Sequence, residues 1–111
     1  MPESLDPKAL DELLAMAGGD REFVVAVVEE YLTDSANTVA ALRSAGGADL
    51  ERAAHTLKST SSSVGALQLA AICQEIERAA KGGPVDAQLI AAAEAEHASA
   101  RAALERHLET M

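Results

Sequence analysis

Apolar residues recur every three or four positions along most of this chain, which is the spacing of one face of an α-helix. Glycine pairs and polar clusters interrupt the pattern and divide it into five segments. The predicted helices cover about residues 5–17, 21–44, 48–61, 66–80 and 86–108. No stretch alternates apolar and polar residues with the β-branched enrichment of a strand, so the pattern predicts an all-α fold.

Several helix ends carry recognisable signals. Asp6 is suited to cap the first helix, with Pro7 at its first position, and Asp20 is suited to cap the second. The run 81–84, Lys-Gly-Gly-Pro, is the clearest stop signal. The run 59–63 contains four serines and a threonine, which are poor helix formers, so we expect the third helix to fray there.

Helices of this length joined by short loops must lie antiparallel to their neighbours. The arrangement that buries four apolar stripes at once is an antiparallel up-down four-helix bundle, and the short first helix would lie across one end. A chain of 111 residues has enough material for one hydrophobic core. We therefore predict a single helical domain over residues 1–111.

The composition excludes several classes of protein. Hydrophobic residues make up 49% of the chain and aromatic residues 2%, as in closely packed alanine-rich helices. The net charge of -9 would repel nucleic acid and favours a soluble monomer. The lone Cys73 lies on an apolar helix face, which suggests a core residue. With no disulfide possible, no signal peptide and no span of about 20 apolar residues, we predict a cytoplasmic protein without membrane association.

One histidine stands on the polar face of the third predicted helix. The apolar stripe of that helix begins at Leu50, and at 100° per residue His55 falls on the opposite side. An imidazole in water near a lysine is suited to reaction rather than to packing. Its neighbours at helical spacing are Glu51, Arg52, Lys58, Ser59 and Ser62.

The residues around His55 form a longer pattern that extends into the next helix. The matching positions are Ala54–Ser59, Ser62–Ala66, then Leu69, Cys73, Ile76 and Glu77, and upstream Gly18–Phe23. This pattern resembles the signature of histidine-containing phosphotransfer (HPt) domains. The family often has glycine four residues after the histidine, where this chain has the still small Ser59. The resemblance implies a phosphorelay intermediate that takes a phosphoryl group from an aspartate of one receiver domain and passes it to another. It also implies that the protein has no ATP site and is not a kinase.

On this resemblance, His55 would be the phosphoryl acceptor, because a neutral imidazole has a free nitrogen lone pair. Lys58, one turn later, would offset the charge of the phosphoryl group. Arg52 would do similar work, although Glu51 beside it partly cancels the effect. The simpler interpretation of both cations is a solvated surface residue or a surface ion pair.

Three further residues have supporting roles on the same resemblance. Ser59 and Ser62 would supply small size and hydroxyl donors, although helix-end chemistry explains Ser62 equally well. Glu77 on the fourth helix would accept a hydrogen bond from the second ring nitrogen and fix the tautomer, unless it is merely solvated. His97 and His107 lack metal-ligand spacing, so we expect surface or edge residues.

The resemblance implies no cofactor of the chain's own, with Mg²⁺ bound instead by the partner. The partners would be receiver domains of response regulators and of hybrid histidine kinases. Their docking should bury exposed hydrophobic residues of the second and third helices near the histidine. An alternative is an adaptor that binds receiver or kinase domains without being phosphorylated. An enzyme is disfavoured, since the sequence has no glycine-rich phosphate loop, nucleophile–base pair or metal cluster.

Overall fold

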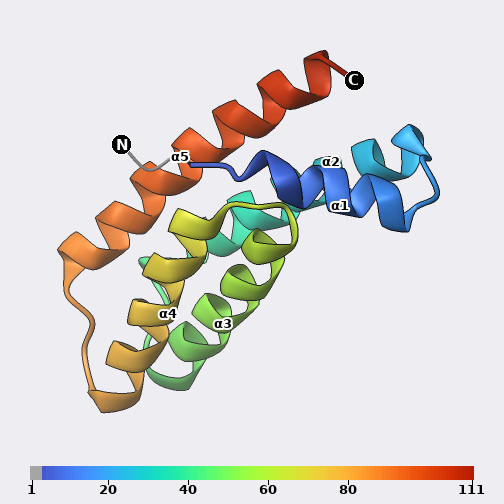
Figure 1. Ribbon diagram of the computed structural model, residues 1–111. Coiled ribbons are helices and arrows are strands. Elements are labelled where there is room, and N and C mark those ends of the chain that lie inside the picture. The colour runs from blue at the N-terminus through green and yellow to red at the C-terminus, as the bar shows by residue number, and fades with distance from the viewer. Residues whose placement is uncertain (1–3) are drawn as a thin grey trace.

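The computed structural model describes residues 4–111, and within them the chain forms five α-helices and no strand. Residues 1–3 of the predicted domain lie outside this described part. The helices are α1 (Pro7–Met16), α2 (Arg21–Leu42), α3 (Gly47–Ser63), α4 (Leu67–Gly82) and α5 (Ala87–Glu109), as Figure 1 shows. All five predicted helices are confirmed, and each end lies within two residues of its expected position.

Aspartate side chains cap three of the helices. The carboxylates of Asp6, Asp20 and Asp86 each accept a hydrogen bond from a backbone N–H of the first turn, at 3.0, 3.2 and 2.8 Å. These N–H groups have no partner inside their own helix, so the caps replace the water they would otherwise need. The first two caps are those predicted from the sequence.

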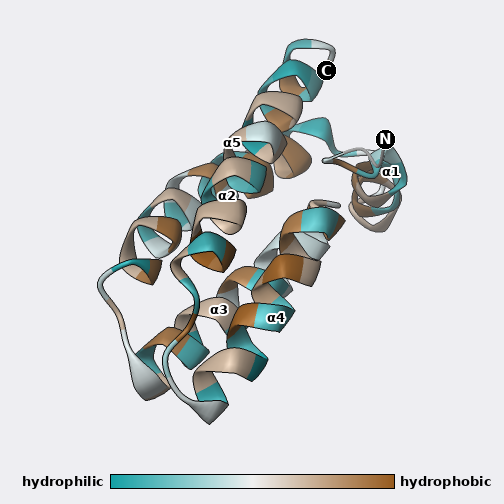
Figure 2. Cartoon of the chain, turned by 90° about the vertical axis from the view of Figure 1, so that its left-hand side faces the viewer, coloured by the Kyte–Doolittle hydropathy of each residue, from teal (hydrophilic) through white to brown (hydrophobic). Residues whose placement is uncertain are grey.

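Four helices pack in a closed ring around the core. α2 contacts α3 and α5, α4 contacts the same two helices, and α1 packs against α2. Figure 2 shows α1 set beside one end of the other four. The ring encloses large apolar side chains that are almost completely buried, namely Val28, Leu42, Leu57, Leu69, Ile76 and Leu104, and α1 adds the buried Leu10.

The serine run at the end of α3 is helical, so the expected fraying is wrong. Ser61 is buried, and its hydroxyl lies 2.8 Å from the Tyr31 hydroxyl of α2. The exposed hydroxyls of Ser62 and Ser63 donate to carbonyls one turn earlier in the same helix. Tertiary packing and these local bonds together outweigh the weak helix propensity of serine.

The expectation that His97 lies at the surface or an edge is also wrong. His97 of α5 is 8% exposed, and its Nε2 lies 2.9 Å from the Ser35 hydroxyl of α2. Burial lowers the pKa of His97, and the nearby charge of Arg101 lowers it further. The ring is therefore favoured in its neutral form. His107, nearer the end of α5, is half-buried, as expected for an edge residue.

Gly65 in the α3–α4 turn holds the start of α1 against the rest of the fold. Its φ of +85° lies in the left-handed region that favours glycine. Its carbonyl accepts a hydrogen bond from the Asp6 N–H at 2.8 Å. A Cβ at this position would stand 2.6 Å from the Asp6 carbonyl oxygen and 2.8 Å from the Ala9 Cβ. The absence of a side chain at Gly65 therefore allows the α3–α4 turn to approach α1 this closely.

Candidate functional site

His55 lies on the outer surface of α3. Leu50, Ala54, Leu57 and Ser61 form the buried face of that helix. The His55 side chain points away from them and is 60% exposed. The ring is therefore open to solvent, as the helical pattern predicted.

Glu77 of α4 connects the His55 ring to Lys58. Its Oε2 lies 3.0 Å from the His55 Nδ1, and its Oε1 accepts a hydrogen bond from the Lys58 Nζ at 2.8 Å. The Glu77 side chain is only 14% exposed, and surrounding atoms partly shield its bond with Lys58 from water, whereas its bond with His55 is exposed. The hydrogen bond from Lys58 is the largest cause that lowers the pKa of Glu77, and the bond with His55 adds to it. Glu77 is therefore a carboxylate at neutral pH.

The carboxylate decides which nitrogen of a neutral His55 ring carries the proton. An ionised carboxylate only accepts hydrogen bonds, so the Nδ1 of His55 must donate to Glu77. The lone pair of the neutral ring is then on Nε2, which lies on the opposite side of the ring from Glu77. The free lone pair of this largely exposed ring is therefore on the nitrogen that Glu77 does not bind.

The packing of α4 explains why Glu77 reaches this position. Leu69, Cys73 and Ile76 face the core, so the next residue, Glu77, lies at the edge of the buried face, beside α3. Burial raises the pKa of the Cys73 thiol to about 12, and the charge of Lys58 opposes this rise only in part. Cys73 is a core residue, as expected, and its thiol stays protonated and unreactive.

The two charged residues N-terminal to His55 have partners other than the ring. The Arg52 guanidinium is exposed and lies 3.7 Å from a carboxylate oxygen of Asp49. The Glu51 carboxylate faces Lys81 of α4, at 3.9 Å. Arg52 is therefore in a loose surface pair, and its partner is Asp49 rather than the adjacent Glu51.

The two serines of the candidate site differ from each other. Ser59 is exposed one turn beyond His55, where its small side chain leaves the ring uncovered. The hydroxyl of Ser62 donates to the Lys58 carbonyl at 3.0 Å, which is the helix-end chemistry considered for it. The structure brings His55, Lys58 and Glu77 together, whereas the hydroxyls of Ser59 and Ser62 make no hydrogen bond to the ring.

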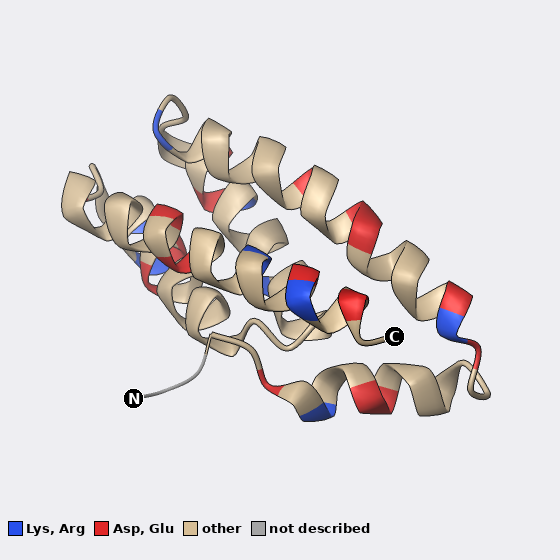
Figure 3. Ribbon diagram, turned by 90° about the horizontal axis from the view of Figure 1, so that it is seen from above, with Lys and Arg blue, Asp and Glu red and all other residues tan. Residues whose placement is uncertain are grey.

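Charged residues do not form a metal site in the part of the chain that the structure describes. No group of three or more His, Cys, Asp or Glu side chains converges among residues 4–111. Figure 3 shows the acidic positions spread over several helices rather than gathered in one place.

Large exposed hydrophobic side chains lie at one end of the molecule. Met16 of α1 and Phe23 of α2 are 84% and 48% exposed, and with Leu13 they line a shallow depression that we call the α1–α2 hollow. Leu67, at the start of α4, is 49% exposed. Exposed hydrophobic residues were expected on the second and third helices near the histidine. The large one on α2 is Phe23, which lies at the start of that helix beside α1, so it does not confirm the expectation, and α3 exposes no large one, so the expectation is wrong for that helix. The exposed Met16 of α1 was not anticipated, although it stands two residues before the glycine pair 18–19.

Comparison with known proteins identifies the family. A family model described as "Hpt domain" matches residues 26–110. The chain belongs to the Hpt domain family. The match includes all of α3 and α4, and with them every candidate site residue. No curated protein matches the sequence.

A solved structure agrees with this assignment over the whole chain. The crystal structure of histidine-containing phosphotransfer protein B (HptB) from Pseudomonas aeruginosa PAO1 is similar to this Hpt domain, with a TM-score of 0.86 and 26% sequence identity. The similarity covers 100% of this chain and 99% of that one. As an Hpt domain, the protein is a histidine phosphotransfer module of phosphorelays, which carries phosphoryl groups and is not a kinase. Between residues 4 and 111 it has no helix long and apolar enough to cross a membrane.

Proposed function

We propose that this Hpt domain accepts a phosphoryl group on the Nε2 of His55 from the aspartyl-phosphate of one receiver domain and passes it to another. The observation that carries the proposal is the hydrogen bond between the His55 Nδ1 and Glu77, on a ring that is 60% exposed. It leaves the lone pair on the nitrogen that faces solvent. Such a nitrogen is a nucleophile without an activating base.

In the proposed transfer, Nε2 forms a bond to phosphorus while the bond from phosphorus to the aspartate oxygen breaks. The aspartate leaves as a carboxylate, and the ring becomes positively charged with its proton still on Nδ1. The Glu77 carboxylate, 3.0 Å from that nitrogen, stabilises this charge. In the second transfer, the aspartate of another receiver attacks the phosphorus, the bond from phosphorus to Nε2 breaks, and the ring becomes neutral again with its proton on Nδ1. The Mg²⁺ would be supplied by the receiver, and the Hpt domain would need no cofactor of its own.

The phosphoryl group would need nearby positive charge to offset its own negative charge, and the receiver that carries it would need open space around the ring. Lys58 was predicted to offset its charge and so was Arg52, whose only ion pair in the described residues is the loose one with Asp49. An arginine in that state has donors available for a phosphoryl oxygen. Ser59 would leave space for the receiver, and its exposed hydroxyl would be a further donor. These roles stay predictions.

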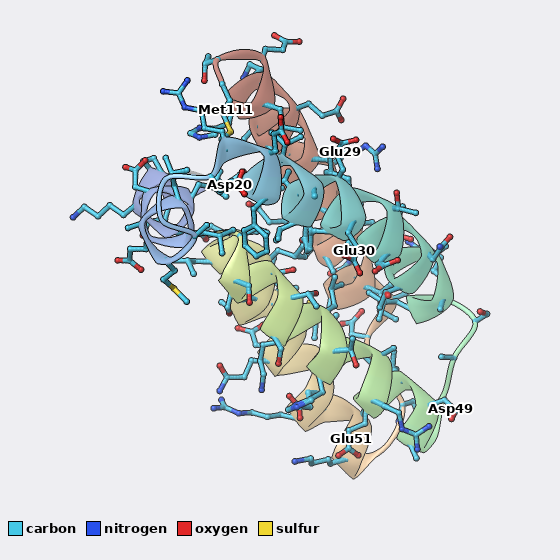
Figure 4. All side chains as sticks on the ribbon, turned by 90° about the vertical axis from the view of Figure 1, so that its right-hand side faces the viewer. Asp20, Glu29, Glu30, Asp49, Glu51 and Met111 are labelled. Carbon is cyan, nitrogen blue, oxygen red and sulfur yellow. The ribbon has the colours of Figure 1, made fainter. Side chains whose placement is uncertain are left out.

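We propose that the receiver covers both His55 and the α1–α2 hollow. From His55 to Ser63, α3 rises about 12 Å, and Gly65 follows in contact with α1. A partner that buries about 800 Å² on each side would span roughly 30 Å, which is enough to reach both features. Figure 4 shows α1 beside the carboxyl-terminal end of α3, which supports a continuous surface.

The remaining features of the proposal concern the whole chain. The contacts of α2, α3, α4 and α5, each with two others of the four, support an up-down four-helix bundle with α1 across one end. We propose that residues 1–111 form one domain that acts as a monomer in the cytoplasm.

The experiment that tests the proposal mixes the domain with a receiver carrying a ³²P-labelled aspartyl-phosphate. We expect label on the wild type that is lost in acid and stable in alkali, as for a phosphoimidazole. His55→Gln should take no label, while the control His107→Gln should be labelled like the wild type. Label on His55→Gln would refute the proposed acceptor. Tight receiver binding without label on the wild type would favour the adaptor alternative.

A further inference from the structure

The structure places the Lys58 ammonium on the side of the His55 ring that does not react. Its Nζ donates to Oε1 of Glu77, whose other oxygen binds the His55 Nδ1. Nε2 points away from this carboxylate. The Lys58 side chain is only 28% exposed, so it lies along the surface between α3 and α4 and is not extended into solvent. The position of Lys58 three residues after His55 had suggested that its ammonium would face the phosphoryl group.

We propose that Lys58 is a positioning residue that acts on His55 through Glu77. This inference rests on the proposed function and concerns the domain before it is phosphorylated. The ion pair fixes the Glu77 carboxylate against α3, with one oxygen directed at the His55 Nδ1. A carboxylate without that anchor would have several side-chain rotamers to choose from and would hold the ring less firmly.

The anchored carboxylate also determines which tautomer of the neutral ring is present. A Glu77 carboxylate held in place accepts a hydrogen bond from Nδ1, so the proton of the neutral ring stays on Nδ1 and the lone pair on Nε2. A carboxylate that leaves this position would let the proton occupy either nitrogen. The pair of Lys58 and Glu77 therefore fixes the tautomer of His55 that can attack through Nε2.

Nuclear magnetic resonance of the His55 ring measures this effect without any phosphoryl transfer. In the wild type we expect the Nδ1–H tautomer. In Lys58→Met, which keeps the apolar stem, the neutral ring should become a mixture of the Nδ1–H and Nε2–H tautomers. The matched control is Lys81→Met, which removes a cation that faces Glu51, at 3.9 Å, and not the ring. An unchanged tautomer in Lys58→Met, or an equal change in Lys81→Met, would overturn the inference.

Labelling with phosphoramidate, a small phosphoryl donor for imidazoles, tests the consequence without a receiver. The Nδ1–H tautomer is the one whose lone pair is on Nε2, so an equal mixture of the two tautomers would slow labelling of Nε2 about twofold. Lys58→Met should therefore be labelled about twofold more slowly at Nε2 than the wild type, and Lys81→Met should be labelled like the wild type. A loss much larger than the measured fall in the Nδ1–H tautomer would instead indicate direct contact with the phosphoryl group, and the inference would be wrong.

A double-mutant cycle with Glu77 is a second way to distinguish an action of Lys58 through Glu77 from a direct action on the phosphoryl group. If Lys58 acts through Glu77, Lys58→Met should slow labelling very little in a Glu77→Ala background. If Lys58 acts on the phosphoryl group, the loss should be the same in both backgrounds, and the inference is wrong. Lys58→Arg, which retains the ion pair, should restore the Nδ1–H tautomer, and a failure to do so would count against the inference. Failure of wild-type His55 to take label, with the Lys58-dependent tautomer intact, would refute the proposed function and leave the positioning role standing.

Discussion

Replacing Gly65 with alanine measures how firmly α1 is attached to the α3–α4 turn. Gly65 has a φ of +85°, a conformation that costs an L-residue about 1–2 kcal/mol. The added Cβ would also stand 2.6 Å from the Asp6 carbonyl oxygen and 2.8 Å from the Ala9 Cβ. Both distances are shorter than van der Waals contact. Since one of these atoms is backbone and the other is a Cβ, neither moves without moving α1.

The size of the effect follows from these two contributions. Overpacking of this kind costs about 1–3 kcal/mol, which together with the backbone conformation gives roughly 2–5 kcal/mol. The 2.8 Å hydrogen bond from the Asp6 N–H to the Gly65 carbonyl is not counted separately. A shift of α1 that relieves the overlap is the same movement that weakens this bond.

Equilibrium unfolding in urea, followed by far-ultraviolet circular dichroism, gives the free energy of unfolding. The matched control is Gly47→Ala, because Gly47 also has a positive φ, +55°, but its Cβ would meet nothing within 4 Å. In that variant the free energy of unfolding should fall only by the cost of the backbone conformation, about 1–2 kcal/mol. Gly65→Ala should therefore lose about 1–3 kcal/mol more than the control. Equal losses in the two variants would refute the tight seating of α1 on Gly65.

Three other outcomes are expected. Ser61→Ala removes the 2.8 Å hydrogen-bond partner of the buried Tyr31 hydroxyl and should cost about 1 kcal/mol in urea unfolding. Adding Tyr31→Phe to it should cost less than the two separate losses combined, and full additivity would contradict the pairing. Because burial lowers the pKa of His97, the unfolded chain binds more protons, and the free energy of unfolding should fall as the pH drops below ~6.5. The slope should not exceed about 1.4 kcal/mol per pH unit, and it should flatten in His97→Gln but persist in His107→Gln. Phe23→Ser should raise the KM for a phosphorylated receiver about tenfold and leave phosphoramidate labelling unchanged, whereas loss of both activities would place the damage in the fold.

The helices were predictable because their signals are local. Apolar spacing located all five, and Asp6 and Asp20 marked two of the starts. The exposure of His55 followed from the same spacing. Its partner Glu77 lies 22 residues further along the chain, and only the resemblance to a known family directed attention to it.

The errors concern polar residues that find partners on other helices. Ser61 bonds to Tyr31 across 30 positions of sequence, and His97 bonds to Ser35 across 62. Neither bond can be deduced until it is known which surfaces of the helices pack against each other. From the sequence alone, a run of serines therefore suggests a frayed helix end, and a histidine suggests a surface residue. In the structure, Ser61 and His97 are buried because each has a hydrogen-bond partner on another helix. The orientation of Lys58 has the same origin, since it depends on the register of α3 against α4.

The proposed phosphoryl acceptor and its partners lie in a single stretch of chain, since His55, Lys58 and Glu77 all belong to the hairpin of α3 and α4. The α1–α2 hollow, which we propose meets the same receiver, comes from the first two helices. On this proposal, mutations that alter which signalling partner is recognised can accumulate in the first forty residues while the reaction is inherited unchanged. Gene duplication followed by divergence of that first part would give carriers that use one chemistry in separate circuits.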